Sequence, residues 1–323
     1  MEQRKLIKLG NSSFAIALPK GWVDKSGLKK GENVFLEENN RGEITIWSKP
    51  KKFSDEKLIE INLADKDISS IRKEIVSAYA RGGTTIHLSG KKGKKELGEV
   101  KDFLKNLISF EVIESMEDKT IAKDFFNLEE ANLDNFVKRI DNNIKEMFNL
   151  VSTAIKKGSL SRKDLEEIEK IDKDTTKFYF LISRLFFKGI DNPSILNTLK
   201  KDSAAFFRDW WFAYNLEHIG DQIKNVARVI QGSEVTPEET KLLFETFSQI
   251  SQAYNESVQS FNKRDFKNAM DSATKSKEIL KTCDKLSQSS NPYTAKLATI
   301  FRELENNSYQ NLKMVMYSGA QND

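Results

Sequence analysis

The sequence predicts a multidomain chain with a small β-rich unit at residues 1–48, a small α/β segment at 58–127 and an all-α bundle at 128–318. Three observations predict this division. Apolar and small side chains alternate between glycines near the start, strand-like and helix-like runs alternate in the middle, and apolar residues recur every three or four positions from Leu128 onward. The polar, basic residues 49–57 are predicted to be a linker.

The composition is that of a globular, helix-rich protein. Charged residues make up 31% of the 323 residues and hydrophobic residues 38%, with only five prolines. No apolar run approaches the ~20 residues that a membrane span needs, and the start lacks the apolar core of a signal peptide. The single cysteine, Cys283, fits a reducing compartment. We therefore expect a cytoplasmic chain without membrane insertion.

The first fifty residues predict short strands and one helical turn. Phe14, Ile16 and Leu18 alternate with small residues, and Pro19 ends this run before a helical turn at 21–26. Further strands are expected at 34–36 and 43–47, around a turn at 39–42. Domains of roughly 40–60 residues usually need help to bury their apolar faces. A dimer through this unit is therefore expected.

Positive charge is concentrated in the same unit. Eleven basic residues stand against six acidic ones up to Phe53, whereas the whole chain has a net charge of only +4. The remainder of the chain is therefore close to neutral. A local basic excess is compatible with a nucleic-acid partner, and equally with lysines that keep a small unit soluble.

The stretch KLGNSSFAIALPKGWVDKSGLKKGENV makes residues 4–47 resemble the swapped-hairpin DNA-binding domain of AbrB, SpoVT and MazE. The resemblance implies a β-barrel in which two chains interlace their hairpins, giving a homodimer that binds double-stranded DNA. Lysines and arginines suit phosphates, and short polar side chains suit base edges or phosphates. The alternative is that residues 11–13 merely build a turn. By position in the resemblance, the DNA-binding candidates are Arg4, Lys5, Lys8, Asn11, Ser12 and Ser13, with Lys20 at the rim.

The middle segment predicts a compact α/β unit. Strands are expected at 58–63, 84–88, 110–114 and 119–124, with helices at 69–81 and 94–107 on one face of the sheet. The basic residues 91–95 lack the glycine and Lys-Ser/Thr spacing of a nucleotide-binding loop. They are interpreted as a solvated loop before a helix.

The remaining residues predict six helices, arranged as two triplets. Their expected ranges are 129–157, 161–188, 194–231, 237–262, 265–289 and 292–317. The helix around 203–231 is distinctive, because Glu217 and Asp221 lie four residues apart on the side opposite its main apolar stripe. Two carboxylates beside the aromatic residues of the preceding turns need a counterion, a metal or a partner. The apolar stripe comprises Phe212, Leu216, Ile219, Ile223, Val226 and Ile230.

The motif NLEHIGDQIKNVA at 215–227 resembles the signature helix of PhoU, the phosphate-uptake regulator. The resemblance implies a helical domain of two three-helix repeats, whose acidic motifs are associated with metal clusters in that family. It implies Asp172, Glu217 and Asp221 as metal ligands and a divalent or iron-type ion as cofactor. Oxygen donors favour Mg, Mn, Fe or Zn, and the sequence does not distinguish among these metals. Salt bridges to lysines are the alternative, and Tyr309, in register with Asp221, argues against a second metal site.

No catalytic constellation is recognisable, and the chain is expected not to be an enzyme. A di-iron carboxylate bundle needs Glu-x-x-His pairs, but the residues three before the two histidines are Thr84 and Asn215. No Ser, Cys or Lys nucleophile has a recognisable neighbouring base.

These observations predict a DNA-binding transcriptional regulator of phosphate uptake or homeostasis, with the helical bundle as the sensor. The alternative is an interaction module that regulates a phosphate transporter or a signalling partner by contact, without its own operator. An antitoxin role is less favoured, because antitoxins usually add a short disordered tail to this domain rather than a bundle.

Overall fold

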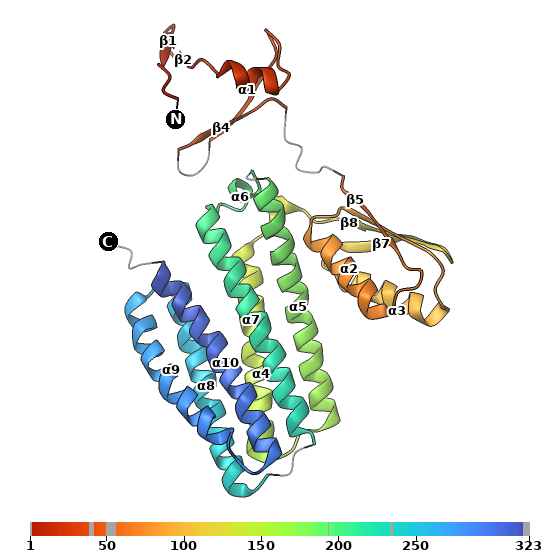
Figure 1. Ribbon diagram of the computed structural model, residues 1–323, viewed down its shortest axis with the longest axis vertical. Coiled ribbons are helices and arrows are strands. Elements are labelled where there is room, and N and C mark those ends of the chain that lie inside the picture. Colours follow the sequence, from red (N-terminus) through yellow and green to blue (C-terminus); the bar gives the residue numbers. More distant parts are fainter. Residues whose placement is uncertain (1, 39–41, 50–55, 193, 233–234, 319–323) are drawn as a thin grey trace. The chain divides into compact units, whose positions relative to one another are not determined.

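The computed structural model describes residues 2–38, 42–49, 56–192, 194–232 and 235–318, and the chain divides into two compact units, 1–55 and 56–323 (Figure 1). Each unit is considered by itself. Of the predicted linker 49–57, residues 50–55 lie outside the described part of the chain.

The first unit consists of two hairpins and one short helix. Strands β1 (Ile7–Leu9) and β2 (Ser13–Ala15) pair antiparallel, as do β3 (Phe35–Glu38) and β4 (Ile44–Trp47), and α1 (Lys20–Lys25) follows Pro19. The predicted strands and helical turn are thus confirmed, although residues 39–41 of the predicted turn lie outside the described residues. Within the first unit of a single chain, the described strands form two separate two-stranded sheets and no closed barrel. The interlaced barrel would need a second copy and stays a prediction.

This unit has no interior of its own. None of the residues described between 2 and 49 is buried. Isolated two-stranded hairpins are only marginally stable in water, because they cannot remove their apolar side chains from solvent. The unit therefore has exposed apolar side chains that a partner could cover. The large apolar side chains exposed here are Leu6, Ile7, Leu9, Phe14, Ile16, Phe35, Leu36 and Ile44.

The second unit begins with the α/β segment. Its sheet has the order β5-β6-β8-β7, in which β5 and β6 are parallel and the other pairs antiparallel. Apolar residues of α2 and α3 pack with those of the sheet into one core, which confirms the predicted arrangement. The elements are β5 (Leu58–Asn62), α2 (Ile68–Ala80), β6 (Thr85–Ser89), α3 (Lys94–Lys105), β7 (Phe110–Ser115) and β8 (Lys119–Asp124).

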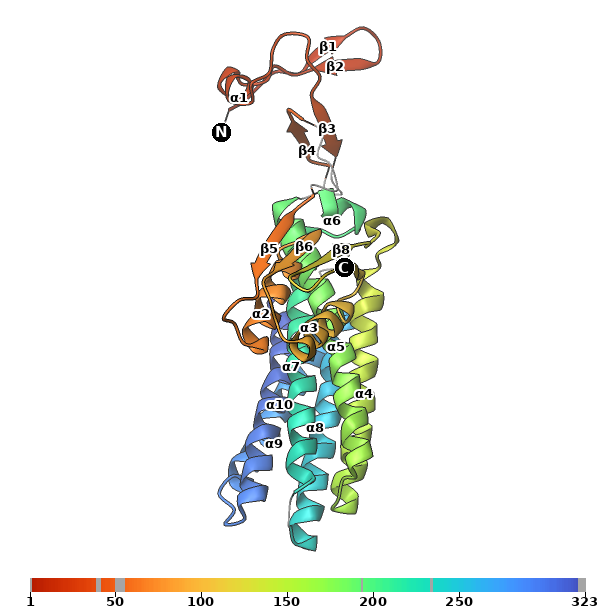
Figure 2. The same ribbon diagram turned by 90° about the vertical axis from the view of Figure 1, so that its right-hand side faces the viewer.

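Long helices make up the rest of this unit, and Figure 2 shows them running side by side. Helices α4, α5 and α7 pack together, α8, α9 and α10 form a second group, and α7 contacts α10 while α4 contacts α8. None of the described helices combines the length and apolar character that a bilayer crossing requires. Their bounds, with the short turns between them, are η1 (Leu128–Glu130), α4 (Leu133–Lys157), α5 (Arg162–Asp191), α6 (Ser194–Thr198), α7 (Ser203–Ile230), α8 (Pro237–Lys263), α9 (Phe266–Leu286) and α10 (Pro292–Tyr317).

The structure corrects one predicted helix. The expected helix 194–231 is two helices, α6 and α7, separated by a turn in which Lys200 has φ +53°. Asp202 then caps α7, because its side chain accepts a hydrogen bond from the Ala205 amide at 2.7 Å. The turn contains neither glycine nor proline, and its local signal for a new helix was the capping residue Asp202, which the prediction did not use.

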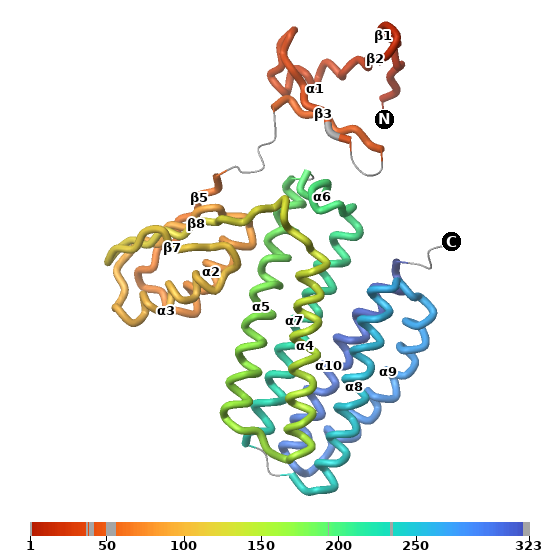
Figure 3. The backbone as a smooth tube through the Cα atoms, turned by 180° about the vertical axis from the view of Figure 1, so that it is seen from behind, coloured from red at the N-terminus to blue at the C-terminus, as the bar shows by residue number. Residues whose placement is uncertain are grey.

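A buried arginine joins the α/β segment to the helices. Arg184 of α5 donates hydrogen bonds to the carbonyl oxygens of Tyr79 at 2.8 Å and Gly83 at 2.9 Å, and forms an ion pair with Asp124. Its guanidinium also lies 4.8 Å from the ring centroid of Tyr79. Figure 3 shows α5 as the bundle helix beside the α/β elements. The helices and the α/β segment therefore form one body.

Candidate functional site

The hairpin β1–β2 carries the centre of the predicted DNA-binding set. Its strands are joined by residues 10–12, and Gly10 has φ +68°, a conformation that side-chain-bearing residues rarely adopt. Asn11 and Ser12 therefore lie at the exposed tip of the hairpin.

The register of this hairpin separates two of the candidates. Lys8 pairs with Phe14 and Leu9 pairs with Ser13. Cross-strand partners share a face, and successive residues point to opposite faces. Lys8 and Ser13 therefore lie on opposite faces of the hairpin, which the sequence did not indicate.

The other candidates flank the hairpin. Arg4 and Lys5 precede β1, and the Arg4 guanidinium lies 2.6 Å from the Glu2 carboxylate. Lys20 is the first residue of α1. All seven predicted residues are exposed, so all of them are accessible to a polyanion.

The second predicted site lies between α5 and α7. The apolar stripe of α7 is buried from Phe212 to Ile230, as predicted, and faces the core of the bundle. Gly220 of the motif permits close packing, because a Cβ atom there would lie 2.9 Å from Cδ1 of Ile144 on α4. This contact gives a structural reason for glycine within the motif.

The side chain of Lys224 contacts two of the three predicted metal ligands. The ammonium of Lys224 lies 2.7 Å from Oδ2 of Asp172 on α5 and 2.5 Å from Oδ1 of Asp221 on α7. Burial raises the pKa of Asp172, while the Lys224 ammonium opposes that effect. The pair of acids is thus held by a protein cation, which is the salt-bridge alternative.

Glu217 lies beside this ion-paired group. Its side chain is 13% exposed, and its Oε2 atom lies 3.3 Å from Nδ1 of His218. Burial, together with the negative charges of Asp221 and Asp172, raises the pKa of Glu217 to about 7. Glu217 therefore exchanges its proton near neutral pH.

A metal does not fit this arrangement as it stands. No group of three or more His, Cys, Asp or Glu side chains in the described part of the chain is arranged to hold a metal ion. The Lys224 ammonium occupies the space between two of the predicted ligands and would repel a divalent cation there. Metal binding by Asp172, Glu217 and Asp221 stays a prediction, and it would require Lys224 to move.

The corresponding place in the second repeat carries a buried glutamate, on which Ser276 and Glu256 act. Glu305 is 1% exposed, and burial raises its pKa to about 7. Tyr309 does not face an acid partner but lies under the ammonium of Lys313, 4.9 Å from its ring centroid. The second repeat thus presents one buried carboxyl rather than an acidic pair.

Aromatic side chains line the outer side of α5 and α7. Trp210 stacks on Phe186 with ring centroids 4.5 Å apart, and its indole N–H donates to Oγ of Ser183 at 3.1 Å. Phe187 and Phe207 continue this row and are 41% and 43% exposed. The row is therefore only partly buried.

Sequence reasoning missed Arg184, the residue that joins the α/β segment to the helices. The available signal was a single charge within the apolar run YFLISRLFF. A charge in such a run is expected to be paired if the helix is buried on all sides. Its partners come from residues 79, 83 and 124, which no local pattern identifies.

Comparison with known proteins agrees with both resemblances. A family model described as "PhoU domain" matches residues 137–230, and one described as "Antidote-toxin recognition MazE, bacterial antitoxin" matches residues 7–55. No curated protein and no solved structure matches the chain. The PhoU match covers α4 to α7, the first three-helix repeat. The chain therefore combines a MazE/AbrB-like N-terminal domain with a PhoU domain.

Proposed function

We propose that this protein is a DNA-binding transcriptional regulator of phosphate uptake or homeostasis. The observation that supports this most strongly is the presence, in one chain, of a MazE/AbrB-like domain with an exposed basic hairpin and a PhoU domain. In this proposal the hairpin unit binds duplex DNA, and the helical unit adjusts that binding to phosphate status through a metal, a small ligand or a partner protein.

The lack of a core in the first unit supports a homodimer. Its described residues include exposed side chains such as Leu9, Phe14 and Leu36 but no buried ones. A second copy offers hairpins of matching length and the same apolar side chains. Association would bury these side chains and place two sets of Lys8 and Asn11 on one assembly.

The proposal is tested by gel shift of the intact protein on genomic fragments at several salt concentrations. Phosphate contacts predict a steep loss of affinity with salt, and base contacts predict sequence preference. Lys8→Ala and Asn11→Ala should weaken binding, whereas Lys241→Ala, an exposed lysine of α8, should not. If the intact protein binds none of the genomic fragments, the proposed regulatory function is refuted.

Mapping of bound DNA in cells tests the link to phosphate. The regulator should occupy sites near phosphate-uptake genes, and its occupancy should differ between phosphate-rich and phosphate-poor growth. Occupancy that is unchanged between the two conditions would separate DNA binding from phosphate sensing.

A second candidate is an interaction module that docks on a phosphate transporter or signalling partner. The aromatic row on α5 and α7 supports it, because exposed aromatic side chains are enriched at protein interfaces. Phe187→Ser and Phe207→Ser would then impair phosphate-dependent regulation while leaving DNA binding unchanged. If Lys8→Ala abolishes regulation and the two phenylalanine substitutions do not, the DNA-binding function is favoured over the interaction module.

A further inference from the structure

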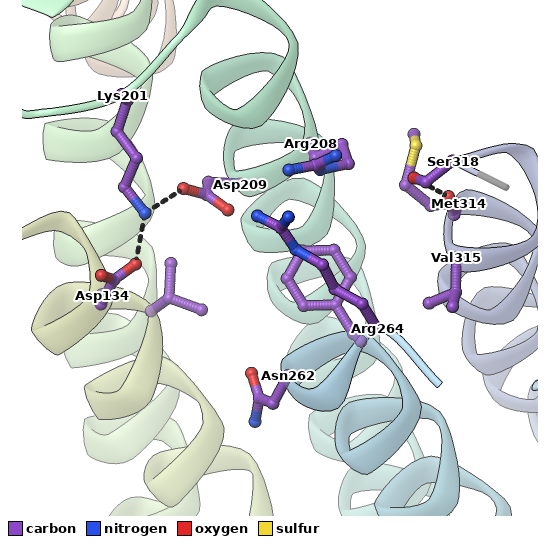
Figure 4. A pocket seen from close by; sticks show the side chains of 11 residues that line it. Asp134, Lys201, Arg208, Asp209, Asn262, Arg264, Met314, Val315 and Ser318 are labelled. Carbon is purple, nitrogen blue, oxygen red and sulfur yellow. Dashed lines mark hydrogen bonds and ion pairs between the residues drawn. The ribbon is translucent and has the colours of Figure 1, made fainter. Parts of the chain in front are cut away.

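A pocket of about 330 Å³ opens at one end of the helical bundle. Its wall comes from α4, α7, α8 and α10, together with the turn before α7 (Figure 4). Phe261, Met314 and Val315 supply an apolar side, and charged side chains supply the rest. The volume lies within the range of small-molecule sites.

Two arginines of the described residues line this pocket without an ion pair or a side-chain hydrogen bond, although Arg208 acts electrostatically on the neighbouring Asp209. They are Arg208 of α7 and Arg264, which follows α8. Figure 4 shows both guanidinium groups directed into the pocket. Arginine offers a planar fork of donors that matches the oxygens of carboxylate and phosphate groups.

Both acids of the pocket are paired with one lysine, which balances one of their two negative charges. The ammonium of Lys201 lies 2.6 Å from Oδ1 of Asp134 and 2.9 Å from Oδ2 of Asp209. These contacts raise the pKa of Lys201 against the opposing effect of burial. Both aspartates are therefore engaged on one wall, and the arginines remain available to a ligand.

The backbone at Arg264 is held in an unfavourable conformation. This residue has φ +52° and ψ +36° at the end of α8, a position where glycine or asparagine is usually found. Side-chain-bearing residues with this backbone are uncommon, and such strain persists mainly where the side chain has a role. Here the conformation places a guanidinium in the pocket.

We propose that this pocket binds a small oxyanion, with its phosphate or carboxylate group between Arg208 and Arg264. The apolar side of Phe261, Met314 and Val315 would receive the body of the molecule. The site is separate from the carboxylates of Asp172, Glu217 and Asp221, because no residue lines both.

Isothermal titration of the full chain at low salt tests the proposal with three probes, namely inorganic phosphate, AMP and citrate. At least one should bind saturably with a Kd below about 1 mM. Arg208→Gln should weaken that binding about tenfold or more, because it removes a charge-assisted contact. The matched control Arg302→Gln removes an exposed arginine of α10 that pairs with Asp284 outside the pocket, and should leave binding unchanged.

Arg264→Gly separates binding from folding. Glycine tolerates the positive φ, so the thermal midpoint should be unchanged or higher, while anion binding falls about tenfold or more. Failure of all three probes to bind the wild type would overturn the proposal. Equal weakening by Arg208→Gln and Arg302→Gln would also overturn it, because general charge would then be the cause.

The titration contains no DNA, so its outcome is independent of the proposed function. A role for the anion as effector does rest on that function. It predicts that the binding probe changes operator affinity in the wild type and not in Arg264→Gly.

Discussion

Arg184 is fully buried and links helix α5 to the α/β segment. Its partner Asp124 has a side chain that is only 8% exposed. A buried ion pair is not by itself strongly stabilising, but removal of one member leaves the other charged and without compensation. The joint between the two parts of the second unit therefore depends on both residues.

Arg184→Gln should lower the free energy of unfolding by about 3–5 kcal/mol, because it leaves the Asp124 carboxylate buried without its cation. Urea denaturation measures this change. Arg162→Gln is the control, since Arg162 pairs with Glu166 at the surface and such pairs contribute about 0–1 kcal/mol. Equal effects of the two substitutions would contradict a structural role for the buried pair.

Glu217 and Glu305 link stability to pH. The pKa of each is about 7 in the folded chain, against 4.5 for an unperturbed glutamate, mainly because of burial. The folded state therefore binds more protons than the unfolded state between these values. The contribution of these two groups to stability is therefore largest below pH 4.5 and is lost as the pH rises from 4.5 to about 7.

Each glutamate should cost roughly 3 kcal/mol of stability at pH 8 relative to its protonated form. Glu217→Gln and Glu305→Gln should each reduce the loss of stability between pH 5.5 and 8 in urea denaturation. Glu303→Gln, at an exposed position of α10, should leave the pH dependence as in the wild type. The same pH dependence in all four proteins would show that neither carboxyl is protonated in the folded state at pH 5.5.

The hairpin β1–β2 presents two different faces, with Lys8 beside Phe14 on one and Ser13 beside Leu9 on the other. A duplex that lies against one face of a hairpin contacts only one of these sets from the same chain. Attraction to phosphates favours the face that carries the ammonium group.

Lys8→Ala should therefore weaken DNA binding and reduce the slope of log affinity against log salt by about 0.9 for each Lys8 that contacts a phosphate, which is about 1.8 for the proposed homodimer. Ser13→Ala should change the affinity less than about twofold, because the hydroxyl lies on the other face. Quantitative gel shift over a salt series measures both. A larger effect of Ser13→Ala than of Lys8→Ala would place DNA on the opposite face.

The helices were largely predictable from local sequence. Thr236, Pro237 and Glu239 begin α8 with the expected capping box, and Ser161 caps α5 through the Asp164 amide. The division of 194–231 was not predicted, because the apolar spacing continues across it and Lys200 adopts its left-handed conformation through the surrounding fold.

The two units of the chain differ in how they are stabilised. The described residues of the second unit form large apolar clusters, in the helices and in the α/β segment, whereas the described residues of the first unit form none. The helical unit is therefore expected to fold alone, while the first unit is expected to depend on a second copy.

If the proposed homodimer forms through this unit, Ile7→Asp should convert it to a monomer and abolish DNA binding, because a carboxylate would enter the apolar surface that a second copy would cover. Light scattering after gel filtration gives the mass, and circular dichroism checks that the helices remain. Leu242→Asp, at an exposed position of α8, is the matched control and should remain dimeric. A wild-type chain that is monomeric at all concentrations would rule out this assembly.

The sequence by itself determined most of the order and type of the elements, apart from the division into α6 and α7, and also the apolar stripe of α7 and both domain resemblances, because these depend on neighbours within a few turns or strands. Only the tertiary structure decided that Lys224 lies between Asp172 and Asp221, that Arg184 reaches Asp124, and that Arg208 and Arg264 share a pocket. These groups come from residues far apart in the chain, and packing of whole helices, rather than local propensity, brings charges of that kind together.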